Sequence, residues 1–268
     1  MEPTTTSLAI FGAAWINRDV ILKLLGPTAD YLGEGMKDLV EARMTNIRNI
    51  FDAAAAKSTA DLDAEGAVPP RVLKGIIDDG SYCDDSLTSQ YFGGLLASSR
   101  SGISRDDRAV GLIALLNTLS AYQIRTHYIF YRIFKDLYSG QDLKIGTEGE
   151  RLELAVFIPL DVYTEALALE PNERAQFGQI QSHALWGLTN SSLIQTMVYG
   201  HEEFIKGHFS AATGPGLIIA PSSFGIELFL WAHGRGDIAP DEFLNSEVEI
   251  EPENDVVINP GSVKAPLT

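Results

Sequence analysis

Three arginines, Arg100, Arg105 and Arg108, form the first group of residues that could do chemistry. They lie in or directly after a serine-rich loop that we predict over residues 98–107. A guanidinium group binds phosphate through two parallel hydrogen bonds, and serine hydroxyls would add donors. The aspartates that end this loop are also natural ion-pair partners of the arginines. Two interpretations stay open: a site for a small anionic ligand such as a nucleotide, or a solvated loop with local ion pairs.

A second group lies in the apolar segment over residues 121–138, which contains Arg125 and His127. Histidine changes its charge near neutral pH and can act as a general acid or base, and Arg125 would help to bind an anion. No carboxylate stands at helical spacing from His127 to orient its ring. We therefore expect either an anion-binding pair or a histidine that is hydrogen-bonded inside the core.

The sequence offers little support for a metal centre. His201 and His208 are seven residues apart in HEEFIKGH, which lacks the HExxH spacing of zinc proteases. Cys83 is the only cysteine, so a four-thiolate zinc site is excluded. Oxygen ligands for a divalent cation could come from Asp78, Asp79, Asp84 and Asp85. Because these aspartates fall at a predicted helix end and helix start, capping is the alternative role, and we assign no metal.

No familiar catalytic motif is present. The segment GRGDIA, residues 234–239, fits a GxGxxA pattern, but it follows a predicted helix, whereas the dinucleotide-binding fingerprint needs a strand, a turn and a helix. The sequence contains neither a P-loop nor a GxSxG motif. We assign no catalytic residue and no cofactor, and the sequence favours a protein that is not an enzyme.

Charge and composition restrict the partners. The chain has 268 residues, of which 45% are hydrophobic, and a formal net charge of −16. Residues 151–268 contain 5 Lys and Arg against 16 Asp and Glu, and eight of these acids lie in residues 237–255. Such a chain repels nucleic acid at long range, so nucleic acid is a disfavoured partner. The apolar run over residues 8–16 is too short to span a bilayer and lacks a basic flank, so we expect a cytoplasmic protein without a membrane partner.

Helical spacing dominates the first half of the chain. Apolar residues recur at helical intervals over residues 36–51, and further helices are predicted over residues 70–80, 85–98, 106–119 and 121–139. Another helix is expected from about residue 18. The cap signals are Pro70, Asp84 or Asp85, and Ser120, with Gly80 and Gly140 as helix ends.

The second half mixes strands with helices. We predict a helix over residues 172–188 capped by Asn172, strands over 193–200 and 217–220, and a helix from Ser222 or Ser223 to Gly234. Residues 152–169 fit either a strand followed by a helix or one bent helix. This order resembles a small winged-helix-like α+β unit. Residues 237–268 contain four prolines and predict an extended acidic tail, in which VEIE could form an edge strand.

The fold class is therefore mainly α: a helical bundle, a small α+β winged-helix-like unit and an extended acidic tail. The expected domains are residues 1–145, 146–236 and 237–268.

Two adjacent glycines stand in the middle of the predicted helix over residues 85–98. Each costs about 1 kcal/mol relative to alanine in a helix. On a helical wheel Gly93, Gly94 and Ala97 lie opposite the bulky Leu95 and Leu96 side. The small face predicts close contact, either with another helix of this chain or with a ligand or partner subunit.

Four segments together resemble the Abi-alpha (abortive infection) family. They are GPTADYLGEGMKDLVEARMTNIRNIF, CDDSLTSQYFGGLLASS, LLNTLSAYQIRTHYIFYRIF and LIIAPSSFGIELFL, and the resemblance covers about residues 20–235. It implies a mainly helical, prokaryotic, cytoplasmic protein connected with phage defence. It supplies no catalytic residue, and the acidic tail lies outside the pattern.

Our principal expectation is a defence-linked interaction or sensor protein that binds a protein partner or itself as a homo-oligomer. Two alternatives remain: a ligand-sensing regulator with a winged-helix-like unit, and a metal-assisted hydrolase or nuclease.

Overall fold

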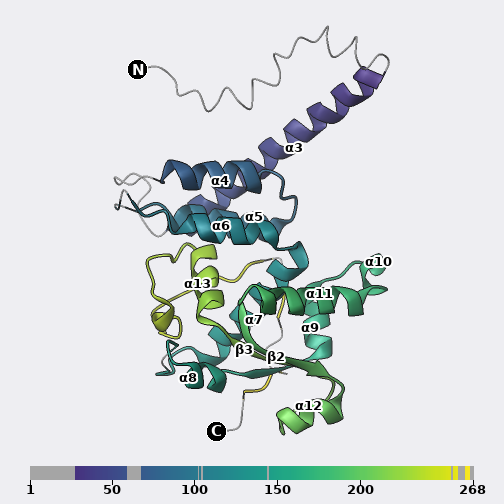
Figure 1. Ribbon diagram of the computed structural model, residues 1–268, viewed down its shortest axis with the longest axis vertical. Helices are drawn as coiled ribbons and strands as arrows, with labels where there is room; N and C mark the ends of the chain where they lie inside the picture. The colour runs from purple at the N-terminus through teal and green to yellow at the C-terminus, as the bar shows by residue number, and fades with distance from the viewer. Residues whose placement is uncertain are drawn as a thin grey trace. The chain divides into compact units, whose positions relative to one another are not determined.

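The computed structural model describes residues 28–58, 68–101, 103, 105–143, 145–254, 256–258 and 263–265, with side chains from residue 41 onward. Residues 1–45 and residues 46–268 form two units. The long helix α3, Thr28–Lys57, begins in the first unit and ends in the second, which contains all the other elements (Figure 1). The helix expected from about residue 18 lies outside the described residues.

The helices predicted in the first half of the chain are confirmed, and Asp85 and Ser120 cap theirs as predicted; the helix predicted from residue 106, however, begins at residue 109 and has no side-chain cap. These helices are α4 (Pro70–Gly80), α5 (Ser86–Ser98), α6 (Ala109–Thr118) and α7 (Ala121–Tyr138). The Asp85 carboxylate caps α5 by accepting the Thr88 amide at 2.8 Å. At the start of α7, Ser120 and Gln123 form a reciprocal capping box, which satisfies two of the amides left free at a helix start.

The ambiguous segment 152–169 forms a strand followed by a helix: β1, Val156–Pro159, leads directly into α9, Leu160–Leu167. The predicted Asn172 cap is wrong. Glu170 instead caps a short helix, α10 (Pro171–Arg174), because Pro171 suits the first helical position and the Glu173 carboxylate accepts the Glu170 amide at 2.7 Å. The remaining elements are α8 (Glu148–Glu153), α11 (Phe177–Asn190), β2 (Ile194–Gly200), α12 (Glu202–His208), β3 (Gly216–Pro221), α13 (Ser223–Ala232) and the 3₁₀ turn η2 (Pro240–Glu242).

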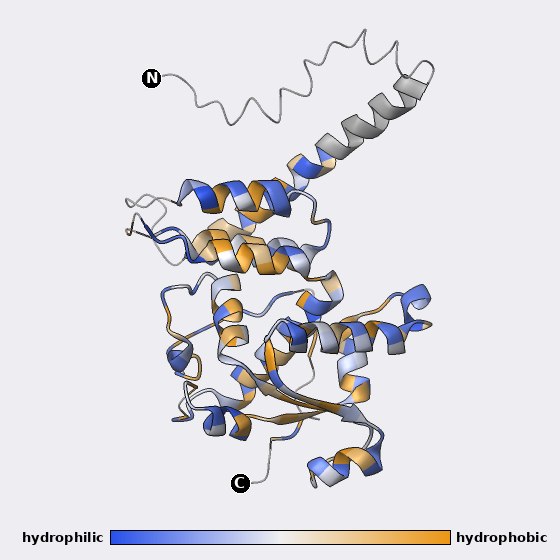
Figure 2. Cartoon of the chain, in the orientation of Figure 1, coloured by the Kyte–Doolittle hydropathy of each residue, from blue (hydrophilic) through white to orange (hydrophobic). Residues whose placement is uncertain are grey.

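The three strands form an antiparallel sheet in the order β1–β3–β2. Ile219 of the central strand pairs with Val156 on one side and with Met197 on the other. All six residues of β3 are buried, which explains why its sequence is an uninterrupted apolar run rather than an alternating one. In Figure 2 the sheet accordingly shows orange, hydrophobic stretches beside paler ones.

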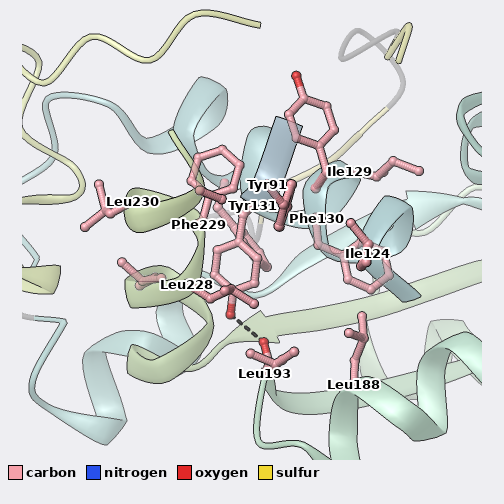
Figure 3. Close-up of a cluster of buried hydrophobic side chains, with 14 of the residues drawn as sticks. Tyr91, Ile124, Ile129, Phe130, Tyr131, Leu188, Leu193, Leu228, Phe229 and Leu230 are labelled. Atoms are coloured by element: carbon pink, nitrogen blue, oxygen red, sulfur yellow. Dashed lines mark hydrogen bonds between the residues drawn. The ribbon is translucent and has the colours of Figure 1, made fainter. Parts of the chain in front are cut away.

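Helix α7 supplies the centre of the core. Phe130, Tyr131 and Phe134 are fully buried, and Phe229 of α13 stacks beside Tyr131 with 5.9 Å between ring centroids. The Tyr131 hydroxyl donates to the Leu193 carbonyl at 2.6 Å, directly before β2, as the dashed line in Figure 3 shows. This bond satisfies the buried phenol and joins the helices to the sheet.

The paired glycines of α5 are approached closely from two directions. A Cβ atom at Gly93 would lie 2.5 Å from the Ala53 Cβ on α3, and one at Gly94 would lie 1.8 Å from the Ala232 carbonyl oxygen on α13. Real Cβ atoms do not come this close to backbone atoms. The small face of α5 thus admits the backbones of two other helices of the same chain.

The C-terminal segment, which the sequence predicted to be an extended acidic tail, packs into the core with several of its described residues. Phe243 and Leu244 are buried in the main core, and the buried Lys135 amine donates to the Phe243 and Asn245 carbonyls at 2.7 and 2.8 Å. No strand is assigned over the VEIE segment, which the structure describes in full; instead Lys264 forms a bridge with Phe157 of β1. Glu247, Glu249 and Glu251 are exposed while the alternating Val248 and Ile250 pack inward, and Glu253 is mostly buried.

The chain is thus mainly helical with a small three-stranded antiparallel sheet. The predicted boundaries at residues 145 and 236 fall inside the unit formed by residues 46–268. Within the part of the chain that the structure describes, no helix combines the length and apolar character needed to cross a membrane.

Candidate functional site

The arginine loop contains a well-defined ion pair. Arg108 donates from Nε and from a terminal nitrogen to both carboxylate oxygens of Asp106, at 2.7 and 2.8 Å. This hydrogen bonding lowers the pKa of the Asp106 carboxyl. The Arg108 guanidinium also lies 5.0 Å from the ring centre of Trp231, within cation–π range. Arg108 is therefore engaged within the chain on two sides.

The other two arginines of the loop are placed differently. Arg105 is exposed in a turn, and Arg100 is half-buried beside the end of α5. The second loop aspartate, Asp107, pairs with Arg71 of α4 at 3.2 Å rather than with a loop arginine. Asp106 and Asp107 thus both accept from arginines, which agrees with the interpretation of a loop with local ion pairs. Anion binding at Arg100 and Arg105 stays a prediction.

His127 is fully buried, and both of its ring nitrogens have partners. Nε2 lies 3.1 Å from the Gly225 carbonyl, which can only accept, so Nε2 carries the proton. Nδ1 then accepts from the Tyr91 hydroxyl at 2.8 Å. Burial lowers the pKa of His127 to about 3. The geometry is that of a neutral, hydrogen-bonded core histidine.

Arg125 does not join His127 in a common site. Its Nε donates to the Ala166 carbonyl of α9 at 2.9 Å, whereas His127 bonds to residues of α5 and α13. Successive side chains on a helix point about 100° apart, so Arg125 and His127, which are two positions apart, point to nearly opposite sides of α7. The structure therefore separates the two residues that the sequence grouped.

A buried polar cluster that sequence reasoning missed lies between α3, α13 and the C-terminal segment. The Lys57 amine forms an ion pair with Glu253 at 2.5 Å, and only 13% and 11% of the two side chains are exposed. Burial lowers the pKa of Lys57, and the Glu253 carboxylate opposes that shift. His233 donates from Nδ1 to the Phe229 carbonyl at 2.7 Å, and its Nε2, 3.6 Å from Glu253, has no hydrogen-bond partner among the described residues. Lys57 and Glu253 are 196 positions apart, so no local pattern could reveal the pair.

Three of the candidate metal ligands have structural roles. The His201 ring caps α12 by accepting the Phe204 amide at 3.2 Å, and Asp78 pairs with Lys74 one helical turn earlier. Asp85 caps α5. Among the described residues no group of three or more His, Cys, Asp or Glu side chains could hold a metal ion.

An open hollow of about 820 Å³ lies along α11, with Trp186 in its lining. Trp186 is 52% exposed to solvent. The His183 ring bonds to the Ser120 hydroxyl at 3.0 Å, which joins the hollow to the start of α7. None of the described lining residues is an Asp, Glu, Lys or Arg; they are Gln123, Gly178, Gln179, Ser182, His183, Trp186, Gly187 and Asn190.

The α11 surface could have been found from sequence, because its residues recur at helical spacing and combine a tryptophan with uncharged polar side chains. The sequence predicted the helix but not a binding role for its exposed face. No protein-family model matches the chain, and neither a curated protein nor a solved structure matches it.

Proposed function

We propose that this chain is a cytoplasmic interaction or sensor protein of an abortive-infection-like phage defence, and that it acts as a homo-oligomer through the exposed face of α11. The observation that carries the proposal is the uncharged hollow around the half-exposed Trp186. The link to phage defence is supported by the resemblance of the four quoted segments to the Abi-alpha family.

This face is the one on which charge least opposes a second copy of the chain as the partner. Two molecules that each have a net charge of −16 repel one another, and the repulsion is weakest where no ionised side chain lies. The α11 face meets this condition and also provides tryptophan, which is over-represented among the residues that dominate binding energy at protein interfaces. Amide and hydroxyl groups around it can exchange hydrogen bonds across a two-fold axis.

Sedimentation of the purified full chain tests the self-association. We expect Trp186→Ala to shift the protein from oligomer to monomer, because the substitution removes the largest exposed apolar surface of the face. Phe204→Ala is the matched control, since Phe204 of α12 is 47% exposed but does not line the hollow. A monomeric wild-type protein, or an oligomer that Trp186→Ala leaves intact, contradicts the proposal.

Phage challenge tests the biological role. We expect cells that express the wild-type chain to form fewer plaques than cells without it, and the Trp186→Ala variant to lose this protection. Phe204→Ala should keep the protection at equal expression. Equal plaque numbers with and without the wild-type gene, over a panel of phages, would count against the defence role.

A ligand-sensing regulator with a winged-helix-like unit is the second candidate. It is favoured by one observation: the antiparallel pair β2 and β3 follows helix α11. The charge of the second half of the chain opposes contact with DNA, because only five of its residues are basic. A gel-shift experiment with duplex DNA at low salt separates the two candidates. Binding would support the regulator, and a lack of binding would support the interaction protein.

A further inference from the structure

A second cavity, of about 980 Å³, lies where the sheet ends and α9 begins. Its lining includes Asp161 and Glu165 of α9, Arg174 of α10 and Phe177 of α11. Cavities that bind small molecules in proteins have volumes of about 300–1,000 Å³. Figure 1 labels the helices that supply these residues.

Backbone contacts fix the walls of this cavity. The Leu160 amide at the start of α9 donates to the Pro215 carbonyl at 3.0 Å, and directly beside it Pro159 of β1 pairs with Gly216 of β3. Arg174 is anchored through its Nε, which donates to the Leu169 carbonyl at 3.0 Å. A site whose walls are already held in place loses less entropy when a ligand binds.

Charged groups of both signs line the cavity without pairing to one another. Asp161 accepts only its neighbour's amide, from Val162 at 2.9 Å, and in the described part of the chain neither Asp161 nor Glu165 forms an ion pair. The two carboxylates are four positions apart on one helix, which places them on the same face about one turn apart. The terminal nitrogens of Arg174 remain able to donate, because its bond to the Leu169 carbonyl uses Nε alone.

We propose that this cavity binds a basic amino acid. Asp161 and Glu165 would each accept from one of the two cationic groups of such a ligand, and the Arg174 guanidinium would donate to its carboxylate. Phe177 adds an aromatic ring that can contact a guanidinium or ammonium group. The net charge of these three ionised side chains is −1, which complements the net charge of +1 of arginine or lysine.

Titration of the full chain with L-arginine and with agmatine, followed by calorimetry and by NMR, tests the site. Agmatine has both cationic groups of arginine but no carboxylate, so we expect it to bind about tenfold more weakly than L-arginine. Arg174→Gln should abolish this preference for two reasons. The variant can no longer bind the carboxylate of L-arginine through a guanidinium, and it no longer repels the doubly charged agmatine. Asp161→Asn combined with Glu165→Gln should weaken both probes at least tenfold.

Glu203→Gln is the control, since Glu203 is an exposed acid of α12 outside the cavity. It should bind both probes as the wild type does. Circular dichroism of each variant checks that these surface substitutions leave the fold intact. Failure of both probes to bind at millimolar concentration overturns the proposal, and so does binding that the Asp161, Glu165 and Arg174 substitutions leave unchanged.

Discussion

At the scale of single residues, the polar groups of the core are held in defined protonation states. His127 is neutral because burial disfavours the charged imidazolium and neither of its hydrogen-bond partners is a carboxylate. One ring nitrogen faces the Gly225 carbonyl and the other faces the Tyr91 hydroxyl. The sequence made this histidine a candidate acid or base, and the lack of a carboxylate at helical spacing was the signal for the alternative. The distant partners Tyr91 and Gly225 could not be deduced from that spacing.

The buried state of His127 has a consequence for stability against pH. Its pKa is about 3 in the folded chain and 6.5 in the ordinary reference state, so the unfolded chain binds the proton more readily. The contribution of neutral His127 to the free energy of unfolding is therefore fully present above pH 6.5. It is lost as the pH falls from 6.5 toward 3, by about 1.4 kcal/mol for each pKa unit by which the folded and unfolded values differ. Urea unfolding at a series of pH values should show this loss.

The variant His127→Gln isolates this contribution, because glutamine retains a donor and an acceptor but does not titrate. We expect its free energy of unfolding to fall less steeply between pH 6.5 and pH 4 than that of the wild type. The exposed histidine His208, replaced by Gln, is the control and should leave the slope as it is. An unchanged slope in His127→Gln would show that His127 does not contribute to this pH dependence.

At the scale of elements, helix starts and ends were predictable because their signals are local. Asp85, Ser120 and Ser222 each cap the helix that they precede, and Gly140 and Gly234 adopt positive φ just after α7 and α13. The prediction of Asn172 as a helix cap failed because Pro171 occupies the first helical position and Glu170 forms a capping box with Glu173. The sequence could not decide between one helix and a strand–helix pair over residues 152–169, because that choice depends on pairing with β3 more than fifty residues later.

The paired glycines allow a matched test of close packing. Gly94→Ala should destabilise the protein by about 1–3 kcal/mol or more, because the new methyl group would overlap the Ala232 carbonyl and the helices must separate. Gly111→Ala on α6 is the control, since no described atom lies within 4 Å of the added Cβ. There the gain in helix propensity should stabilise the protein by up to about 1 kcal/mol. Thermal unfolding of both variants measures the difference, and equal effects would refute the contact between α5 and α13.

At the scale of the whole molecule, the C-terminal segment belongs to the folded body rather than to a tail. Its composition predicted exposure, because the eight acids over residues 237–255 dominate any local average of charge. The alternating Val248 and Ile250 are buried nonetheless, and Arg132 donates to the Ile250 carbonyl at 2.6 Å. Local composition could not show that cationic side chains on distant helices bind the backbone of this segment.

The ion pair between Lys57 and Glu253 gives the sharpest test of this attachment. Glu253→Gln leaves the buried Lys57 ammonium without its carboxylate, and we expect a loss of about 3–5 kcal/mol in the free energy of unfolding. The double variant Lys57→Met with Glu253→Gln should recover part of that loss, since a neutral pair avoids the desolvation of both charges. The exposed pair Lys206–Glu202, whose side chains are 49% and 45% exposed, supplies the control Glu202→Gln, which should cost less than about 1 kcal/mol. Urea unfolding of the wild type and the three variants measures these free energies. If Glu253→Gln lowers the free energy of unfolding no more than Glu202→Gln does, the C-terminal segment is not anchored to α3 in solution. The buried polar cluster around Lys57 would then be open to water.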